Sequence, residues 1–238
     1  MEKITAEHLE DIPMCTALRL SSGHRVSMVE HLLAALAGVG VFNAAIRVLG
    51  AELPILDGSA SPWVEKINQA GIVELAAPQK SLCLPALELQ DGKSSIQCTP
   101  NTDSELQITA SVEIAHSGFG SHRATFLLHN PQIFQQQLAP ARTFGFLKDW
   151  QQLKQQNRAR GASLENTVVF TPAGLHPDQK LRFDQEPLRH KIIDIIGDLA
   201  TVGYPICGRV DAHQPSHRCN QRLAALLDRW VRHHQSHP

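Results

Sequence analysis

Apolar residues recur every three to four positions in several stretches of the chain, which is the spacing of an amphipathic helix. Residues 29–36 (VEHLLAAL) form the first such stretch, and Ser27 is placed to cap its N-terminus. Gly38 and Gly40 are placed to end it. A second helix is predicted for WVEKINQAGI, which ends at Gly71. Later helices are predicted for LKDWQQLKQQ, for 187–200 and for NQRLAALLDRWVRHH.

A different pattern, in which apolar and polar residues alternate, begins after residue 80. The stretches SIQCTP, LQITASVEI and ATFLLH, all within 81–128, predict antiparallel strands. Further strands are predicted for 43–50 (NAAIRVLG), for NTVVF and for 203–213. The segment AAPQK between the two patterns has the composition of a linker. We therefore expect an α+β protein with two small sandwich domains, residues 1–78 and 79–238.

The predicted helix 187–200 carries a polar stripe. His190, Asp194 and Asp198 follow one another at intervals of four residues, so they lie nearly above one another on one helix face. Most of the remaining positions are apolar, which indicates a buried helix, and buried charges need partners or a metal ion. An imidazole and a carboxylate one turn apart are suited to zinc. A satisfied helix pair explains the same spacing equally well.

A metal site on this stripe needs a further ligand, and the start of the helix 29–36 offers one. Glu30 and His31 place a carboxylate beside an imidazole at the opening of an apolar helix. If His31 binds the ion, Glu30 is close enough to take a proton from water. Glu7 and His8 form the same dipeptide, but polar residues follow them, and we expect them at the surface.

A hydrolytic site also needs an acid for the leaving group, and the loop DAHQPSHRCN contains two imidazoles. His213 and His217 are both candidates, although a loop histidine is usually just solvated. The carboxylate of Asp198 is placed to accept a hydrogen bond from such an imidazole, which would orient the ring and favour its protonated form.

Length, charge and cysteine content narrow the class of protein. The chain has 238 residues and a net charge of −1, and a nucleic-acid surface would need a basic patch. Its five cysteines include no C-x-x-C pair, and an odd number fits a reducing compartment better than a disulfide framework. The N-terminus lacks the apolar core of a signal peptide, and the longest apolar run, 32–42, is too short to span a bilayer. We expect a soluble, cytoplasmic protein that does not bind nucleic acid.

Five stretches carry a resemblance: MVEHLLAALAGVGVFNAAI, LPILDGSASPWV, ARTFGF, LRFDQEPLRHKIIDIIGDL and HRCNQRLAALL. Together they resemble the UDP-3-O-acyl-N-acetylglucosamine deacetylases, the zinc enzymes of lipid A biosynthesis in Gram-negative bacteria. The stretches occur in the family's order and with family-like spacing across nearly the whole chain. Each one alone is unspecific, whereas the set of five is highly specific.

The resemblance implies a reaction and a metal site. The expected activity is zinc-dependent removal of the acetyl group from UDP-3-O-(3-hydroxyacyl)-N-acetylglucosamine, which gives UDP-3-O-(3-hydroxyacyl)-glucosamine and acetate. His31, His190 and Asp194 match the zinc ligands of the family. Glu30 matches the general base that activates water.

Five other positions match family residues with roles around the metal. His217 stands in SHRCN, where the family tends to have G-H-x-x-N, and matches a cationic histidine that assists the intermediate and amine departure. Asp198 matches the carboxylate that orients this histidine. Thr143 in ARTFGF matches a hydroxyl that helps to hold the carbonyl oxygen. Lys191 and Phe144 match residues that bind the substrate.

The resemblance also implies a fold and a partner. The family has two α/β sandwich domains of similar topology with the active site between them, and a β-α-β insert forms a tunnel for the acyl chain. The insert corresponds to about 146–170 here. The family usually begins with further strands and a G-V-G-L-H-x-G stretch, so we expect the first domain to be incomplete at its N-terminus. The expected partner is a nucleotide-sugar lipid substrate. We expect a monomer that makes at most transient contact with the membrane surface.

Three functions remain open at this point. The first is an active metal-dependent deacetylase. The second is a shortened, non-catalytic relative that only binds a nucleotide-sugar or a lipid. The third is a zinc-stabilised structural domain, which would need four protein ligands where the sequence offers three and a base. The sequence favours the first, because a binding module has no need of a base, an acid and three ligands together.

Overall fold

The computed structural model has an α+β fold, as the sequence predicts, and describes residues 1–102, 104–114, 119–155 and 161–235. The helices are η1 (Ala6–His8), α1 (Glu30–Gly38), α2 (Ser61–Ala70), α3 (Pro131–Ile133), η2 (Phe134–Leu138), α4 (Leu147–Gln155), α5 (Glu186–Ala200) and α6 (His217–Gln235). The strands are β1 (Leu9–Glu10), β2 (Ala17–Arg19), β3 (Arg25–Ser27), β4 (Leu82–Cys83), β5 (Leu87–Asp91), β6 (Ser94–Thr99), β7 (Leu106–Ile114), β8 (Gly120–Leu128), β9 (Phe144–Phe146), β10 (Val168–Thr171), β11 (Gly174–Leu175) and β12 (Ile206–His213).

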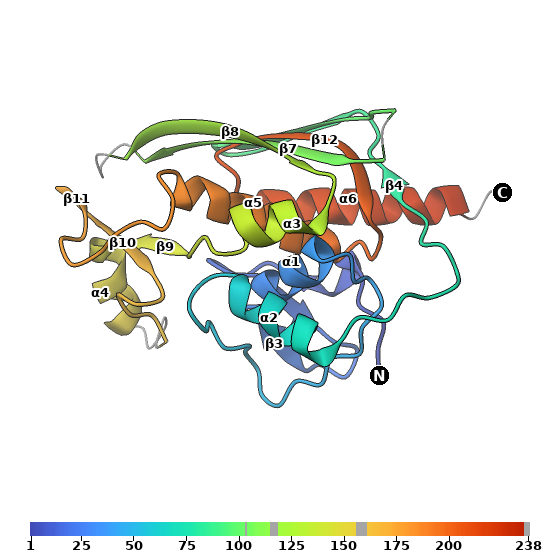
Figure 1. Ribbon diagram of the computed structural model, residues 1–238, viewed down its shortest axis with the longest axis horizontal. Helices are drawn as coiled ribbons and strands as arrows, with labels where there is room; N and C mark the ends of the chain where they lie inside the picture. The colour runs from blue at the N-terminus through green and yellow to red at the C-terminus, as the bar shows by residue number, and fades with distance from the viewer. Residues whose placement is uncertain (103, 115–118, 156–160, 236–238) are drawn as a thin grey trace.

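The elements form successive layers (Figure 1). Five strands of a six-stranded sheet have the order β5-β6-β12-β7-β8. The sixth strand, β4, pairs with β12. Helices α5 and α6 cover one face of this sheet, and α1 and α2 follow as the next layer. The small sheet β1-β2-β3 closes the other side of α1 and α2. The division into domains 1–78 and 79–238 stays a prediction, and the main apolar core includes residues from both segments.

Helix α5 lies at the centre of these layers because nine of its fifteen residues are apolar or small. Twelve of its residues are buried, the polar stripe among them. Gly197 sets the distance to the neighbouring helix, since an added Cβ would lie 2.1 Å from the carbonyl oxygen of Glu30. This close approach brings the first turn of α1 onto α5, and with it the dipeptide Glu30-His31.

We expect the substitution Gly197→Ala to separate α1 from α5. The new methyl group would meet backbone atoms that cannot rotate away, so the free energy of unfolding should fall by about 1–3 kcal/mol. Chemical denaturation measures this loss. Gly145→Ala is the matched control, because nothing lies within 4 Å of a Cβ added there. A loss of the same size in both variants would contradict the close packing of the two helices.

A separate unit begins within the ARTFGF stretch, whose last three residues form β9. Strands β9 and β10 pair in parallel, with Val168 opposite Phe144 and Phe170 opposite Phe146, and α4 lies in the connection between them. Strand β11 adds to β10 in antiparallel fashion. Figure 1 shows this unit at one end of the molecule, beyond the N-terminal end of α5. Residues 156–160 of the expected insert lie outside the described part of the chain.

Two local predictions are wrong. Residues 43–50 form no strand, because a strand needs a hydrogen-bonding neighbour, and no strand in the described part of the chain pairs with them. Ser27 does not cap α1. It ends β3, its hydroxyl donates to the carbonyl of Ala51, and Val29 occupies the cap position without a side-chain hydrogen bond.

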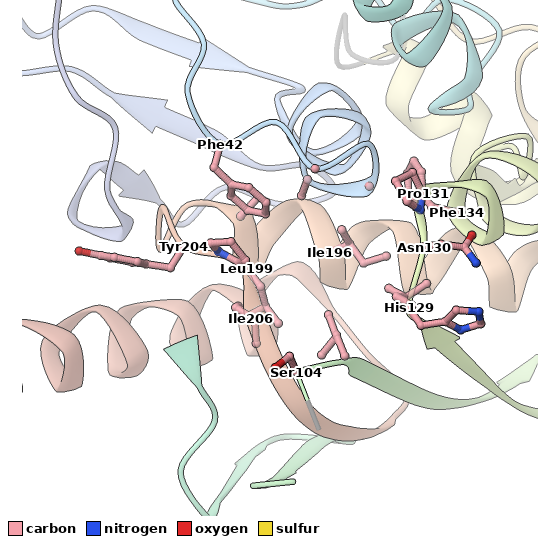
Figure 2. A pocket seen from close by; sticks show the side chains of 17 residues that line it. Phe42, Ser104, His129, Asn130, Pro131, Phe134, Ile196, Leu199, Tyr204 and Ile206 are labelled. Atoms are coloured by element: carbon pink, nitrogen blue, oxygen red, sulfur yellow. The ribbon is translucent and has the colours of Figure 1, made fainter. Parts of the chain in front are cut away.

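Two cavities lie away from the polar stripe. One, of about 230 Å³, lies near the C-terminal ends of α1 and α5, where Phe42, Ile196, Leu199 and Tyr204 line it (Figure 2). The other, of about 620 Å³, lies between α1 and the small sheet. Neither is lined by a residue of the stripe.

Among the described residues, no helix combines the length and the apolar character that crossing a bilayer requires.

Candidate active site

Three buried side chains from two helices converge where α1 meets α5. His190 and Asp194 lie one turn apart on α5, with 3.4 Å between Nε2 and Oδ1. His31, in the first turn of α1, faces them with its Nε2 atom 3.3 Å from that of His190. One possible ligand atom from each residue lies within 4.8 Å of the other two. The spacing on α5 alone predicts two of these three possible ligands, and the packing of α1 against α5 adds His31.

The hydrogen bonds and burial of the two imidazoles suit them to binding a cation. His190 donates from Nδ1 to the carbonyl oxygen of Ala141 at 3.0 Å, which leaves the lone pair of Nε2 directed at the cluster. Burial lowers the pKa of His31 to about 3 and also lowers the pKa of His190. Both rings are therefore neutral at physiological pH, as metal ligands must be.

Asp194 is the strongest sign that the cluster holds a cation. Its side chain is 3% exposed, and Oδ1 accepts no hydrogen bond from any residue in the described part of the chain. Burial favours the neutral acid, but Lys191 and the imidazoles outweigh it and hold the pKa of Asp194 well below its usual value. Lys191 donates to the other oxygen, Oδ2, at 2.9 Å. A charged carboxylate with one unsatisfied buried oxygen fits a bound metal ion.

Glu30 has the environment of a general base. Its carboxylate accepts a hydrogen bond from the backbone N–H of Thr16 at 3.0 Å and is almost fully buried. Burial raises the pKa of Glu30 to about 7. A carboxylate with this pKa both accepts and returns a proton at physiological pH.

His217 begins α6 and has the environment of a cationic acid. Its Nδ1 donates to Asp198 Oδ2 at 3.0 Å, and its Nε2 lies 3.7 Å from Asp194 Oδ2. Burial alone lowers the pKa of His217, but the carboxylates of Asp198 and Asp194 outweigh this effect and raise it to about 9. The ring is therefore protonated at neutral pH, with Nε2 turned towards the cluster.

Comparisons with known proteins decide the family. A family model described as UDP-3-O-acyl N-acetylglycosamine deacetylase (LpxC) matches residues 1–229. The chain belongs to this family. UDP-3-O-acyl-N-acetylglucosamine deacetylases from Shewanella sp. (strain W3-18-1) and Shewanella baltica (strain OS155 / ATCC BAA-1091) are each 37% identical to this LpxC-family chain over 231 residues. The matches cover 94% of this chain and 75% of each relative.

Membership in the LpxC family confirms the resemblance found in the sequence. The protein is an enzyme of a deacetylase family whose members are metalloenzymes. The cluster of His31, His190 and Asp194 is the group of residues that fits a metal ion in the part of this LpxC-family chain that the structure describes.

Lys191 and Phe144 lie together beside the cluster, whereas Thr143 directly precedes β9. The Lys191 ammonium, already bonded to Asp194, is 5.7 Å from the centre of the Phe144 ring. Thr143 is half-buried, and its backbone N–H donates to Gly58 at 2.8 Å. No hydrogen bond between described residues joins the Thr143 side chain to the three possible ligands. The roles of these three residues stay predictions.

The structure shows where the other candidates that residue spacing offered are located. Of the two loop histidines, His217 joins the cluster, while His213 is exposed and contacts the Ser111 hydroxyl at 3.0 Å. Of the two Glu-His dipeptides, Glu7-His8 lies on η1, away from the cluster, and His8 contacts Glu2 at 2.8 Å.

Sequence reasoning missed Thr16, which is fully buried and links the proposed base to the proposed acid. Its backbone N–H holds Glu30, and its hydroxyl donates to Asp198 and lies 3.2 Å from His217 Nδ1. Asn220 adds a second donor to Asp198 at 2.9 Å. Asn220 lies on α6 one turn after His217, a spacing that would have indicated it. Thr16 has no such signal, since 182 residues separate it from Asp198.

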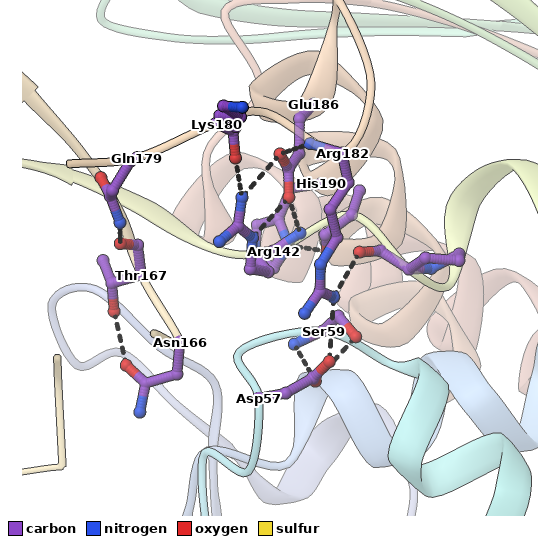
Figure 3. Close-up of polar contacts among 12 residues, drawn as sticks. Asp57, Ser59, Arg142, Asn166, Thr167, Gln179, Lys180, Arg182, Glu186 and His190 are labelled. Atoms are coloured by element: carbon purple, nitrogen blue, oxygen red, sulfur yellow. Dashed lines mark hydrogen bonds and ion pairs between the residues drawn. The ribbon is translucent and has the colours of Figure 1, made fainter. Parts of the chain in front are cut away.

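A buried ion pair fixes the loop beside His190 (Figure 3). Glu186, in the first turn of α5, receives the Arg142 guanidinium at 2.8 and 3.2 Å and the Arg142 backbone N–H at 2.9 Å. The backbone N–H of Arg182 donates to it at 2.7 Å. Arg142 immediately follows Ala141, whose carbonyl orients His190, so this pair holds that carbonyl in place. Arg182 also joins the loop to Asp57 at 2.9 Å.

Proposed function

We propose that this protein is a zinc-dependent hydrolase that removes the acetyl group from UDP-3-O-(3-hydroxyacyl)-N-acetylglucosamine in lipid A biosynthesis. The products are UDP-3-O-(3-hydroxyacyl)-glucosamine and acetate. The observation that carries the proposal is the buried cluster of His31, His190 and Asp194, with a base and a cationic acid beside it, in a chain of this deacetylase family.

The donor set supports zinc as the metal. Two imidazole nitrogens from His31 and His190 and one carboxylate oxygen from Asp194 are typical of catalytic zinc sites, which keep a fourth position open. When bound, the ion supplies a Lewis acid that polarises the acetamide carbonyl and makes water more acidic. A structural zinc site would need a fourth protein ligand, and three residues make up the group found among the described residues.

Glu30 and His217 divide the proton transfers. Glu30 takes a proton from the water that attacks the acetamide carbonyl, because its pKa of about 7 makes it an effective base at neutral pH. The new bond joins the water oxygen to the carbonyl carbon, and the bond from that carbon to nitrogen then breaks. Protonated His217 stabilises the negative charge that develops on oxygen. Either residue has a proton for the departing amine nitrogen.

Other residues bind and orient the substrate in this proposal. The Thr143 hydroxyl helps to hold the carbonyl oxygen, while Lys191 and Phe144 hold the polar headgroup. The unit of β9, α4 and β10 receives the acyl chain, and Val168 and Phe170 pack with Phe146 into the core of this unit. A cytoplasmic location and a monomeric state remain predictions from the sequence.

The proposal is tested by the products of one reaction. Purified protein is incubated with UDP-3-O-(3-hydroxymyristoyl)-N-acetylglucosamine, and acetate and free amine are quantified together. Equal amounts of both products are expected, with far slower release from UDP-N-acetylglucosamine, which lacks the acyl chain. A folded, zinc-loaded sample that releases neither product would favour a binding protein without catalysis.

A further inference from the structure

Two cysteines that are distant in the sequence meet at the sheet. Cys83 on β4 and Cys207 on β12 are opposite each other in the parallel register, and their sulfur atoms are 2.8 Å apart. Backbone hydrogen bonds hold this register on both sides of Cys83. Leu82 N–H donates to Pro205 at 2.7 Å, and Leu84 N–H donates to Cys207 at 2.8 Å. The sheet therefore fixes the backbones of the two cysteines side by side.

The two thiols differ in their access to solvent. Cys83 is exposed, and it is the one exposed cysteine of the five, all of which are described. Cys207 is 2% exposed and lies directly behind it. Cys98 and Cys219 are buried and Cys15 is half-buried. A reagent in solution therefore reaches the pair through Cys83.

We propose that Cys83 and Cys207 are a modification site at which a low-molecular-weight disulfide of the glutathione class forms an intramolecular disulfide. Neighbouring positions in a sheet place the Cα atoms within the range that a disulfide bridges. The cysteines are 124 residues apart, which is why the sequence gives no sign of the pair.

The reaction is a thiol–disulfide exchange in two steps. The Cys83 thiol loses its proton to solvent, and its sulfur attacks one sulfur of oxidised glutathione, which releases the first glutathione thiolate. The Cys207 sulfur then attacks the Cys83 sulfur of this mixed disulfide, loses its own proton and releases the second glutathione. Two protein thiols are oxidised, one glutathione disulfide is reduced, and the protons pass through solvent to the two glutathione thiolates. Burial raises the pKa of Cys207 to about 11, so the Cys207 thiol is a poor first nucleophile. The first attack on glutathione disulfide therefore comes from Cys83.

The disulfide would fasten β4 to the long strand β12. It closes a long loop, which restricts the unfolded chain and raises the midpoint of thermal unfolding by at least about 5 °C. The pair lies at the start of β12, and His213 at its other end is six residues away, roughly 20 Å along a strand. His217 lies beyond that end, so we expect turnover to change by less than about 2-fold.

Trypsin provides a direct test. Cleavage after Lys80, Lys93, Lys191 and Arg209 leaves Cys83 alone in peptide 81–93 and Cys207 alone in peptide 192–209. Purified protein treated with oxidised glutathione should yield these two peptides as one cross-linked species, without a glutathione adduct. Reduction should restore both peptides and return the unfolding midpoint to its starting value.

Variants separate this disulfide from other oxidation products. Cys83→Ser, at an exposed position, should abolish the cross-link and the rise in the unfolding midpoint, whereas Cys15→Ser should keep both. Glutathione that stays on Cys83 in the wild type would overturn the proposal. A Cys83–Cys83 dimer of two chains would overturn it as well, as would a Cys207 that resists oxidation at all glutathione ratios.

Discussion

Replacing Glu30 with glutamine should reduce deacetylase turnover by about 10²–10⁴-fold without loss of the metal. The amide is nearly isosteric, and its oxygen can still accept the Thr16 N–H that Glu30 accepts at 3.0 Å. It cannot take a proton from water, which is the role that burial and a pKa of about 7 assign to Glu30. Steady-state rates and metal content per chain, measured on the same sample, separate the two effects.

The second Glu-His dipeptide supplies the matched control. Glu7→Gln makes the same chemical change on η1, where Glu7 is exposed and contacts Arg232. Turnover should stay within about 2-fold of wild type, because surface substitutions away from the site have small effects. If Glu30→Gln retained near-normal turnover, the base would have to be another group.

The substitution Arg142→Ala should lower the free energy of unfolding by about 3–5 kcal/mol. It leaves the carboxylate of Glu186, which is fully buried, without its cation. The backbone N–H groups of Arg142 and Arg182 would remain as its donors. The loop that holds Ala141 against His190 should also loosen, so the affinity for the metal should fall together with stability. Denaturant titration and competition with a chelator measure the two losses.

A second ion pair in the same network shows how much burial contributes to the free energy of unfolding. Arg182 and Asp57 are 2.9 Å apart, close to the 2.8 Å of the Arg142–Glu186 pair, but about a third of each side chain is exposed. Arg182→Ala should therefore cost only about 1 kcal/mol. Equal losses in the Arg142 and Arg182 variants would mean that burial of the Arg142–Glu186 pair is not what stabilises the loop.

Elements with a strong local pattern could be predicted from the sequence. The helix over 187–200 and the stripe of His190, Asp194 and Asp198 on it follow from spacing alone, and α5 confirms the helix with bounds Glu186–Ala200. The composition of segment 43–50 is typical of a strand, yet this segment forms no strand. A strand depends on its neighbour, and no local pattern reports whether a neighbour is present.

The site was predictable to the extent that family motifs or helix spacing mark its residues. Neither marks Thr16, whose contacts to Glu30 and Asp198 exist only after α1 and α5 pack together. Residue spacing alone left His213 and His217 open, and the family motif pointed to His217. The structure places His217 at the start of α6, beyond the end of β12. Tertiary packing, which local periodicity does not encode, decided the place of Thr16.

The most direct test of the account is the dependence of turnover on one bound metal ion. The purified protein is stripped with a chelator, and acetate release is followed while zinc is returned in steps. We predict that the stripped protein loses at least about 100-fold of its turnover. One zinc ion per chain should restore it, and His190→Ala should neither bind the ion nor recover. Full turnover in protein shown to be free of metal would contradict the assignment of His31, His190 and Asp194 as ligands of a catalytic ion.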